Sequence, residues 1–275
     1  MKIGVVGLGL IGGSFCKAIK AKTDYICMGM DKNPDVLSKA INEGVIDGEL
    51  TKETLKDCDI VIVSLYPKAT VSFLNDNAKN FNKNGIVTDV CGIKSYVIEE
   101  TKKALKENGV TFIGAHPMAG REFSGFDYSL PDLFEGASFI MTPDKDTDNE
   151  KIDILRKLAE KLGFSKIVKT DVKTHDETIA FTSQVAHVIS NAYVKSPALQ
   201  NESGFSAGSF QDLSRVAKLN EDMWTDLFLL NKEPLLNEID IIINHLSEYR
   251  KALAEENSEE LKSLLRDGRI LKENG

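Results

Sequence analysis

Over the first 170 positions, hydrophobic and polar residues form two kinds of pattern, which follow each other in turn. Short apolar runs bounded by Gly, Pro, Asn or Asp predict buried strands, and amphipathic segments between them predict helices. Strands that alternate with helices of about ten to fifteen residues are typical of a parallel, doubly wound sheet. The predicted strands are Lys2–Gly7, Tyr25–Met30, Ile60–Leu65, Gly85–Asp89, Val110–Ala115, Ala137–Met141 and Lys166–Lys169. The predicted helices are Gly12–Ala21, Asp35–Glu43, Lys68–Phe81, Ser95–Glu107 and Asn149–Leu162.

From Asp171 onward the pattern is helical. The apolar run Ile239–Ile243 lies inside Leu235–Glu256, which lacks Gly and Pro, so it predicts part of a long helix rather than a strand. We therefore expect an α/β protein with a Rossmann-like domain at 1–170 and an all-helical domain at 171–275. Small helical domains often bury an apolar face against a second copy, so we also expect a homodimer. Breaks between the helices are predicted near Ser196–Gly208, Glu221, Lys232–Glu233 and Glu256–Ser258.

The first strand runs directly into a glycine fingerprint that opens the first helix. In this context the first glycine allows a tight turn, the second lets the backbone approach a pyrophosphate, and the third lets the helix pack closely on the strand. The N-terminus of the helix presents unpaired N–H groups to the phosphates. A glycine-rich turn of another nucleotide or flavin fold is the alternative. The residues expected to bind the dinucleotide here are Gly7, Leu8, Gly9, Leu10, Ile11 and Gly12.

Asp31 follows the second strand, about 20 residues after the last fingerprint glycine. An acidic residue at this place accepts hydrogen bonds from the adenosine ribose. Because its charge repels a 2′-phosphate, the expected cofactor is NAD rather than NADP.

Composition narrows the class of protein without identifying it. Hydrophobic residues make up 42% and charged residues 28% of the 275 positions, as in an ordinary globular protein. The net charge of −8, without a long basic run, argues against nucleic acid as a partner but leaves room for an anionic small substrate. No apolar run is long enough for a membrane span. The four cysteines lie far apart, which favours reduced thiols in a cytoplasmic protein over a metal site or disulfides.

Ligands of an open α/β sheet bind at the carboxyl ends of its strands. Ser64 and Leu65 lie at such an end, and we expect them to contact the cofactor. His116 directly follows another apolar strand, where a neutral imidazole can take a proton from a substrate hydroxyl. A histidine that only fixes the following loop is an equal alternative. The three segments expected to converge are Ser64–Pro67, Asp89–Lys94 and His116–Glu122.

Several blocks of the chain resemble the prephenate dehydrogenase family. They cover nearly the whole chain, in order, at 7–14, 89–94, 114–125, 182–190 and 208–217. The resemblance implies a Rossmann-like domain followed by a helical dimerisation domain. It also implies NAD-dependent oxidative decarboxylation of prephenate to 4-hydroxyphenylpyruvate, a step of tyrosine biosynthesis. Arogenate, with an amino acid arm in place of the keto acid arm, is the alternative substrate.

The resemblance assigns roles to several residues. It makes His116 the base that takes the ring hydroxyl proton, and Arg215 the clamp on a substrate carboxylate. It places His187 in the substrate pocket, where the alternative is a core histidine. The alternative for Arg215 is a salt bridge on the helix surface or between domains. His175 also fits a family motif, and a capping or interdomain role is equally open.

Two charged residues follow the histidine block. Arg121 and Glu122 are expected to shape the pocket, and a cationic Arg121 favours the keto acid arm. The alternative for Arg121 is a surface pair with Glu122 or Asp127.

The sequence also departs from the family pattern. Gly92 stands where some members have a serine, so one contact to the substrate hydroxyl or the histidine is in doubt. The helical C-terminal sequence leads us to expect no regulatory domain of the type that many relatives carry.

Two other classes of protein fit parts of the chain. A hydroxyacid or pyrroline-carboxylate reductase shares the two-domain plan but does not account for His116 together with Arg215. A non-catalytic NAD-binding sensor also leaves these two residues unexplained.

Overall fold

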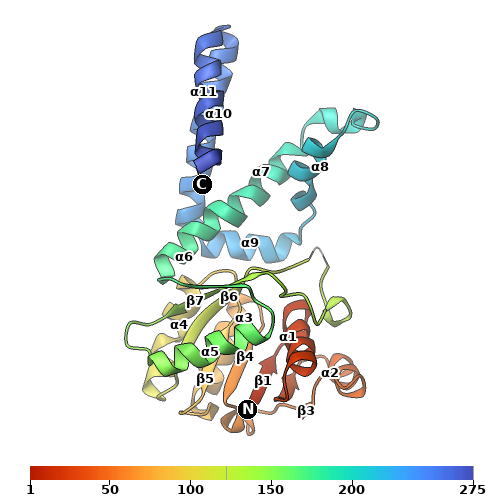
Figure 1. Ribbon diagram of the computed structural model, residues 1–275, viewed down its shortest axis with the longest axis vertical. Coiled ribbons are helices and arrows are strands. Elements are labelled where there is room, and N and C mark those ends of the chain that lie inside the picture. The colour runs from red at the N-terminus through yellow and green to blue at the C-terminus, as the bar shows by residue number, and fades with distance from the viewer. Residues whose placement is uncertain (122, 275) are drawn as a thin grey trace.

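The computed structural model describes residues 1–121 and 123–274. Within these residues a sheet of eight strands forms the N-terminal part, and the helical part stands at the carboxyl ends of its parallel strands (Figure 1). The strands are β1 (Lys2–Val6), β2 (Ile26–Met30), β3 (Gly48–Glu49), β4 (Ile60–Val63), β5 (Ile86–Asp89), β6 (Phe112–Pro117), β7 (Ser138–Pro143) and β8 (Lys166–Lys169).

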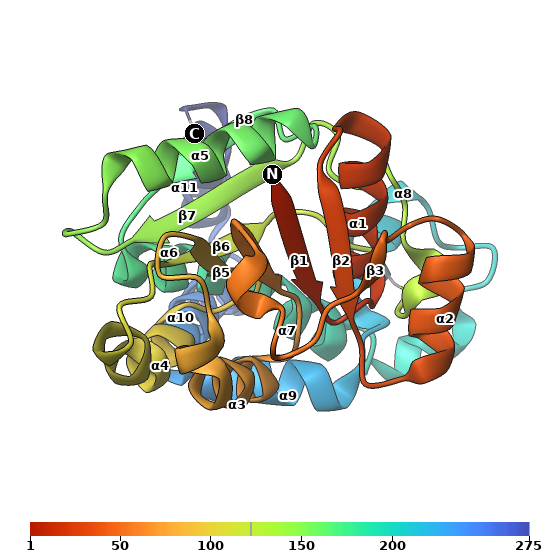
Figure 2. The ribbon, with the colours of Figure 1, turned by 90° about the horizontal axis from the view of Figure 1, so that it is seen from below.

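Helices cover both faces of the sheet. Seen from below, α1 and α5 lie on one face and α3 and α4 on the other (Figure 2). Neighbouring residues of β4 therefore enter different cores: Ile62 packs with one face, and Val61 with the other. This explains why the strand reads as an unbroken apolar run. The helices are α1 (Leu10–Lys22), α2 (Pro34–Asn42), α3 (Pro67–Asn77), α4 (Ser95–Glu107) and α5 (Asn149–Lys161).

The strand order β3-β2-β1-β4-β5-β6 is the doubly wound order, with all neighbouring strands parallel. The predicted doubly wound sheet is confirmed. The topological switch lies between β1 and β4, so the crevice at their carboxyl ends is where a ligand belongs.

Strand β7 departs from the predicted parallel arrangement, because it runs antiparallel to β6. No helix long enough to cross the sheet lies between these strands in the described residues, which form loops and a short 3-10 turn (Phe126–Tyr128). Met118 N donates to Ser138 O at 2.8 Å, so β7 starts at the edge where β6 ends. Helix α5 then supplies a crossover, and β8 is parallel to β7.

Two smaller features also differ from the prediction. Strand β3 was not predicted, because a two-residue strand has no hydrophobic period. Helix α3 ends at Asn77 rather than Phe81, and a 3-10 turn (Ala78–Asn80) follows it.

The helical part begins with one nearly continuous helical rod. Within it, α6 and α7 are joined by a π-helical segment (Ala180–Gln184). The predicted long helix is confirmed as α10, which contains Ile239–Ile243. In the described part of the chain, no helix is long and apolar enough to cross a membrane. The helices are α6 (Val172–Ile179), α7 (Val185–Tyr193), α8 (Gly208–Ser214), α9 (Glu221–Leu230), α10 (Lys232–Ala254) and α11 (Ser258–Asn274).

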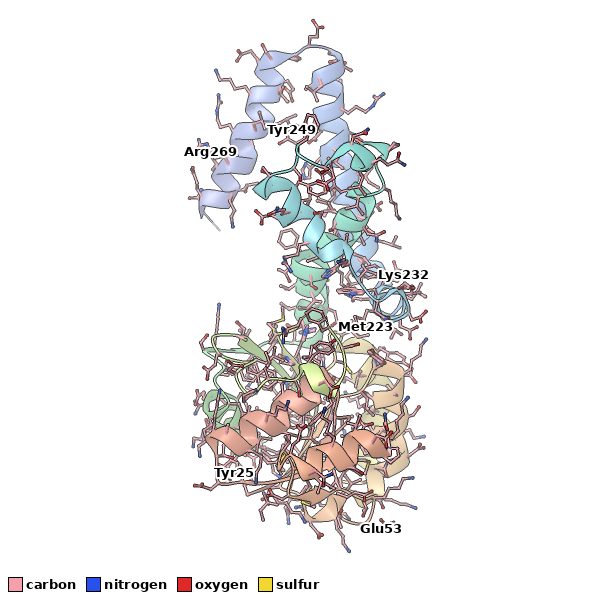
Figure 3. All side chains as sticks on the ribbon, turned by 90° about the vertical axis from the view of Figure 1, so that its right-hand side faces the viewer. Tyr25, Glu53, Met223, Lys232, Tyr249 and Arg269 are labelled. Atoms are coloured by element: carbon pink, nitrogen blue, oxygen red, sulfur yellow. The ribbon has the colours of Figure 1, made fainter. Side chains whose placement is uncertain are left out.

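Helices α10 and α11 form a hairpin that projects away from the sheet (Figures 1 and 3). Tyr249 Oη donates to Leu264 O at 3.2 Å and joins the two helices. The hairpin carries large apolar side chains in solvent: Leu246 is 62%, Leu253 61% and Leu271 75% exposed. Its apolar face is therefore not covered by the rest of the described chain.

Candidate active site

The glycine turn has the geometry that its sequence predicts. Gly7 has φ of 85°, and a Cβ there would lie 2.4 Å from Ser64 O. A Cβ on Gly12 would lie 1.8 Å from Gly7 O, so the helix packs on the turn only with glycine. A Cβ on Gly9 would have no atom within 4 Å. Gly9 therefore borders open space, and the two other glycines are required by the fold itself.

The N-terminus of α1 opens onto this space. Gly9 is its N-cap and makes no side-chain capping bond, and Leu10 and Ile11 begin the helix. Asp31 Oδ2 accepts from Leu8 N at 2.7 Å, which ties the end of β2 to the glycine turn. Backbone donors and an acidic acceptor at this spacing fit the pyrophosphate and ribose of a dinucleotide.

Ser64 and Leu65 lie on the other side of the glycine turn, at the end of β4. The β-carbon of Ser64 lies near the position of a Cβ on Gly12, and the side chain of Leu65 lies near that of Gly7. The structure therefore brings both predicted residues beside the fingerprint.

His116 lies near the end of β6, where it is half-buried and pairs in register with Ile140 of β7. Its Nδ1 lies 3.0 Å from His175 Nε2. His175 Nδ1 in turn lies 2.7 Å from Asp176 Oδ1. The three side chains form a chain of hydrogen bonds from α6 to the sheet.

The tautomers of both histidines follow from Asp176. An ionised carboxylate only accepts hydrogen bonds, so His175 Nδ1 carries the proton and His175 Nε2 has a lone pair. His116 Nδ1 must then donate to it, which leaves the lone pair of His116 on Nε2. Asp176 also accepts from the backbone N–H groups of Lys94 and Ser95, each at 2.8 Å. These bonds hold the carboxylate in place at the start of α4.

The electrostatic surroundings keep His116 neutral. Burial lowers the pKa of His116 well below its usual value of 6.5, and the neighbouring His175 and the charge of Lys94 lower it further. The carboxylate of Asp176 acts in the opposite direction. At neutral pH the imidazole is therefore unprotonated, which is the state a general base needs.

Gly92 faces the lone pair of His116. A Cβ at position 92 would lie 3.7 Å from His116 Nε2, an ordinary contact distance. Position 92 therefore lies beside the nitrogen that carries the lone pair, and glycine leaves this space free.

A second group of residues lies on α7, on α9 and on the 3-10 turn (Arg215–Ala217) that precedes α9. Its predicted members are His187 and Arg215. The rings of His187 and Trp224 stack with centroids 3.8 Å apart. Burial lowers the pKa of His187, and the charge of Arg215 lowers it further, so Arg215 lies near this imidazole. His187 is half-buried, and its Nδ1 lies 2.9 Å from Ser183 O, so its place in the substrate pocket stays a prediction. This histidine lines a cavity of about 300 Å³ together with Lys195, Leu219, Glu221, Trp224 and Phe228.

The two groups are connected by the helical rod. His175, which is hydrogen-bonded to His116, lies on α6. His187, whose pKa is lowered by the charge of Arg215, lies on α7. The residues lining the 300 Å³ cavity do not include His116 or Arg215. A single pocket shared by His116 and Arg215 therefore stays a prediction.

Arg121 and Glu122 were expected to shape the substrate pocket, and the structure describes only the first of them. Arg121 is exposed, and its guanidinium lies 5.5 Å from the centroid of the Phe123 ring. Asp127 is paired with Lys39 at 2.7 Å, so it is not the ion-pair partner suggested for Arg121. Glu122 lies outside the described residues.

Two residues of the site were not singled out from the sequence. These residues are Asp176 and Trp224. An acidic residue directly after a histidine was a usable signal for Asp176. Nothing local in the sequence marks Trp224, because its stacking on His187 depends on how α9 packs.

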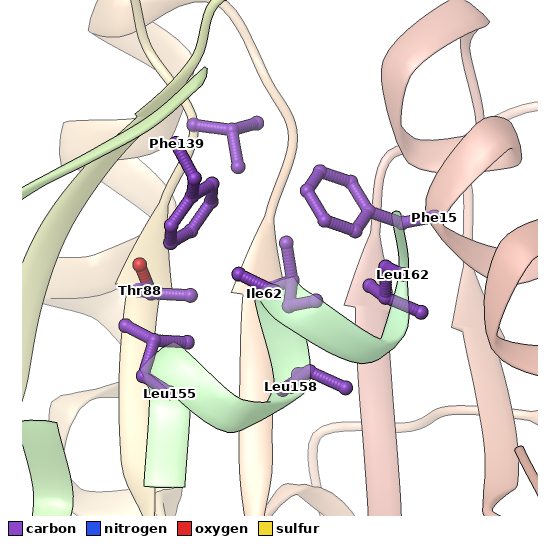
Figure 4. A pocket seen from close by; sticks show the side chains of 9 residues that line it. Phe15, Ile62, Thr88, Phe139, Leu155, Leu158 and Leu162 are labelled. Atoms are coloured by element: carbon purple, nitrogen blue, oxygen red, sulfur yellow. The ribbon is translucent and has the colours of Figure 1, made fainter. Parts of the chain in front are cut away.

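A second cavity lies far from this chemistry. It has a volume of only about 10 Å³ and lies between the sheet and α5, where Phe15, Ile62 and Leu158 line it (Figure 4). An apolar space of this size is a packing void rather than a binding site. The four cysteine thiols are free and buried, and none belongs to a metal-binding group among residues 1–121 and 123–274.

Two family models match the chain. Residues 15–168 match the nucleotide-binding domain of prephenate dehydrogenase, and residues 171–267 match its dimerization domain.

Curated relatives agree over nearly the full length. Prephenate dehydrogenase of Lactococcus lactis subsp. cremoris is 31% identical over 99% of this chain and 77% of its own. Prephenate dehydrogenase of Bacillus subtilis is 29% identical over 94% of this chain and 71% of its own. Cyclohexadienyl dehydrogenase of Zymomonas mobilis is 28% identical over 94% of this chain and 90% of its own.

Solved structures share the whole architecture. Prephenate dehydrogenase from A. aeolicus, in complex with hydroxyphenyl propionate and NAD+, has a TM-score of 0.87 and 29% identity, covering 100% of this chain and 98% of that one. Synechocystis arogenate dehydrogenase has a TM-score of 0.86 and 26% identity, covering 100% of this chain and 99% of that one. With both domain models matched in order and a relative above 30% identity, this chain belongs to the prephenate dehydrogenase family.

Proposed function

We propose that this chain is an NAD-dependent prephenate dehydrogenase of tyrosine biosynthesis, which converts prephenate to 4-hydroxyphenylpyruvate and carbon dioxide. The observation that carries the proposal is the neutral imidazole of His116. Its free lone pair lies near the end of β6, on the edge of the sheet that also holds the dinucleotide fingerprint. Relatives named for this activity match the chain over nearly its full length.

The chemistry asks the protein to move one proton and to hold the substrate in place. As the ring hydroxyl gives its proton to His116 Nε2, hydride leaves the same carbon. The electrons of the C–C bond to the ring carboxylate enter the ring as carbon dioxide departs, and the ring becomes aromatic. His116 then returns the proton to the ring oxygen, which gives the phenol of 4-hydroxyphenylpyruvate. NAD, when bound, accepts the hydride. Gly7, Leu8, Gly9 and the first turn of α1 would hold its pyrophosphate, and Asp31 would hold its ribose.

Binding of the substrate falls to the second group of residues. Arg215 clamps a substrate carboxylate, because a planar guanidinium gives two parallel hydrogen bonds to it. His187 lies within reach of the charge of Arg215 and lines the neighbouring cavity. Its Nδ1 donates to Ser183 O at 2.9 Å, which leaves Nε2 to face a ligand.

The side arm of the substrate is the finer choice within the family. Arogenate carries an ammonium group on its arm, whereas prephenate carries a keto group. Arg121 lies on the loop that follows His116, and its charge disfavours an ammonium group there. This supports prephenate over arogenate.

We also propose that the enzyme is a homodimer. The surface of this chain measures 15587 Å², about a third more than a compact monomer of its mass exposes. The exposed apolar side chains of α10 and α11 account for part of the excess, and a second copy covers them. Mass measurement by light scattering tests this: a monomer at working concentration contradicts it. The buried free thiols fit a reducing, cytoplasmic setting.

The test of the function is NADH formation by the purified protein with prephenate and with arogenate as separate substrates. We expect turnover with NAD, and a higher kcat/KM for prephenate. Turnover with neither substrate contradicts the proposal, and turnover with arogenate alone overturns the choice of substrate. A His116→Asn protein, prepared in parallel, controls for contaminating dehydrogenases.

A further inference from the structure

Lys94 is a buried charged residue that the proposed chemistry does not use. Its side chain and that of Asp89 are both 0% exposed, and Lys94 Nζ is paired with Asp89 Oδ2. Two buried charges are costly unless each is paired and its remaining hydrogen-bonding capacity is used. The partners of this pair show what it does.

The ion pair binds both backbone groups of one residue of β6. Lys94 Nζ donates to the carbonyl oxygen of Ala115 at 2.6 Å. Asp89 Oδ1 accepts from the amide of Ala115 at 3.3 Å, and Asp89 Oδ2 accepts from Cys91 N at 3.0 Å. Ala115 directly precedes His116. The ion pair therefore fixes the backbone that carries the imidazole.

These contacts stand where backbone pairing between β5 and β6 ends. The parallel register of the two strands reaches Asp89 and Gly114 and stops there. Strand β6 continues to Pro117, whereas β5 has ended at Asp89 and the chain leads on to α4. The amide and carbonyl of Ala115 thus lack a partner strand on this side, and unpaired buried backbone groups are costly. Lys94 and Asp89 supply the donor and the acceptor that a longer β5 would have supplied.

We propose that Lys94 and Asp89 are positioning residues for the catalytic imidazole, acting as a side-chain extension of β5 that locks Ala115 and so aims His116. Lys94 holds the other end of the hydrogen-bonded chain as well. Its backbone N–H donates to Asp176 Oδ1 at 2.8 Å, and Asp176 holds His175, which holds His116. One residue thereby fixes both the backbone and the ring of the base.

Charge adds a second effect to this geometry. The charged and titratable groups that act on the pKa of His116 are His175 and Asp176 on α6 and Lys94, which directly precedes α4. Asp89, at the end of β5, is paired with Lys94. On the β7 side, the residue in register with His116 is the apolar Ile140. Among these groups, the ammonium of Lys94 lowers the pKa of His116. Loss of this charge therefore raises the pKa of the imidazole and shifts the acid limb of activity to higher pH.

The test uses the full-length protein with Asp89 and Lys94 replaced together. Removal of one partner alone leaves a buried unpaired charge, so the variant is Asp89→Asn/Lys94→Met, which keeps similar volume without charge. We expect kcat with prephenate to fall by about tenfold or more, with substrate KM within about threefold, because a displaced base costs rate rather than binding. In the protein without cofactor, ¹⁵N-histidine NMR should show a higher His116 pKa. The chain has four histidines, and His116→Asn assigns the signal.

The matched control is Lys151→Met. Lys151 Nζ donates to Gly85 O at 3.0 Å, a lysine-to-carbonyl bond near the opposite end of β5. This variant should leave both kcat and the His116 pKa at their wild-type values. A folded double variant with wild-type kcat and wild-type His116 pKa overturns the proposal.

The wild-type protein offers a measurement that needs no variant to fold. A buried, hydrogen-bonded ammonium exchanges its protons slowly, so Lys94 should give a ¹⁵Nζ signal that surface lysines do not. Exchange as fast as that of the surface lysines contradicts the proposal. The inference rests on the proposed function only in taking His116 as the base. Failure of the wild type to form NADH defeats that function, whereas the NMR readouts judge the ion pair separately.

Discussion

The imidazole rings of His116 and His175 are hydrogen-bonded to each other at 3.0 Å, although one belongs to the sheet and the other to the helical part. The bond places the candidate base at the junction of the two parts of the molecule. It also sets its tautomer, because His175 is itself oriented by Asp176. Movement of the helical part relative to the sheet therefore affects the proton acceptor directly.

Replacement of His175 tests this relationship. His175→Phe removes the acceptor of the His116 Nδ1 proton, and we expect kcat to fall more than about tenfold, since an imidazole without its orienting partner loses the reactive tautomer. His175→Gln keeps a carbonyl acceptor and should retain part of the activity. Similar losses in both variants, with large changes in KM, contradict the orienting role.

The pH dependence of the same variants has a definite sign. The proposed base must be neutral to accept a proton, and the lowered pKa of His116 keeps it neutral to below its usual 6.5. Wild-type kcat/KM should therefore stay level through neutral pH and fall only under more acidic conditions. His175 contributes to the lowering, so the acid limb of His175→Phe should lie at higher pH. An acid limb of the wild type above 6.5 contradicts the assignment of His116 as the base.

The fold was predictable because its signals are local. The apolar runs of β1 and β4 and the glycine turn mark the doubly wound sheet directly. The direction of β7 was not predictable from periodicity, because it depends on a loop with no hydrophobic pattern.

The candidate site was predictable only in part. His116 and Arg215 stood out by their motif blocks. The bond of His116 to His175 and the stacking of Trp224 on His187 join residues far apart in sequence, so they appear only in three dimensions. Lys94 lay within a recognised block, yet its contact with Ala115 has no signature in the spacing.

Replacement of Arg215 tests its proposed role as the clamp on a substrate carboxylate. Arg215→Ala should raise substrate KM by about tenfold to a hundredfold, the cost of a lost hydrogen bond to a charged group, while kcat changes much less. Arg215→Lys keeps the charge but lacks the planar guanidinium, so its substrate KM should lie between those of the wild type and Arg215→Ala. Unchanged KM in Arg215→Ala means that the carboxylate is held elsewhere.

Asp31 tests the choice of cofactor. Asp31→Asn removes the charge that repels a 2′-phosphate but keeps an acceptor for Leu8 N. We expect weaker NAD binding and a smaller preference for NAD over NADP, measured as the ratio of their kcat/KM values. A preference equal to that of the wild type counts against a ribose contact by this carboxylate.

Gly92 offers a gain-of-function test. A Cβ at this position makes only ordinary contacts with His116, and Gly92 is not among the glycines with positive φ, so Gly92→Ser should fold normally. The added hydroxyl lies near His116 Nε2, and we expect kcat/KM to rise by about twofold to tenfold, the worth of one neutral hydrogen bond. Gly92→Ala, without the hydroxyl, should match the wild type. A loss of activity in both variants means that the substrate itself needs this space.

The most direct test of the account is the kcat of His116→Asn with saturating prephenate and NAD. Asparagine keeps a hydrogen-bonding side chain but cannot take the hydroxyl proton. We predict that kcat falls by a factor of about 10² to 10⁴, while KM for both ligands stays within about threefold. A kcat within about threefold of the wild type would contradict proton transfer to His116 and, with it, the proposed site.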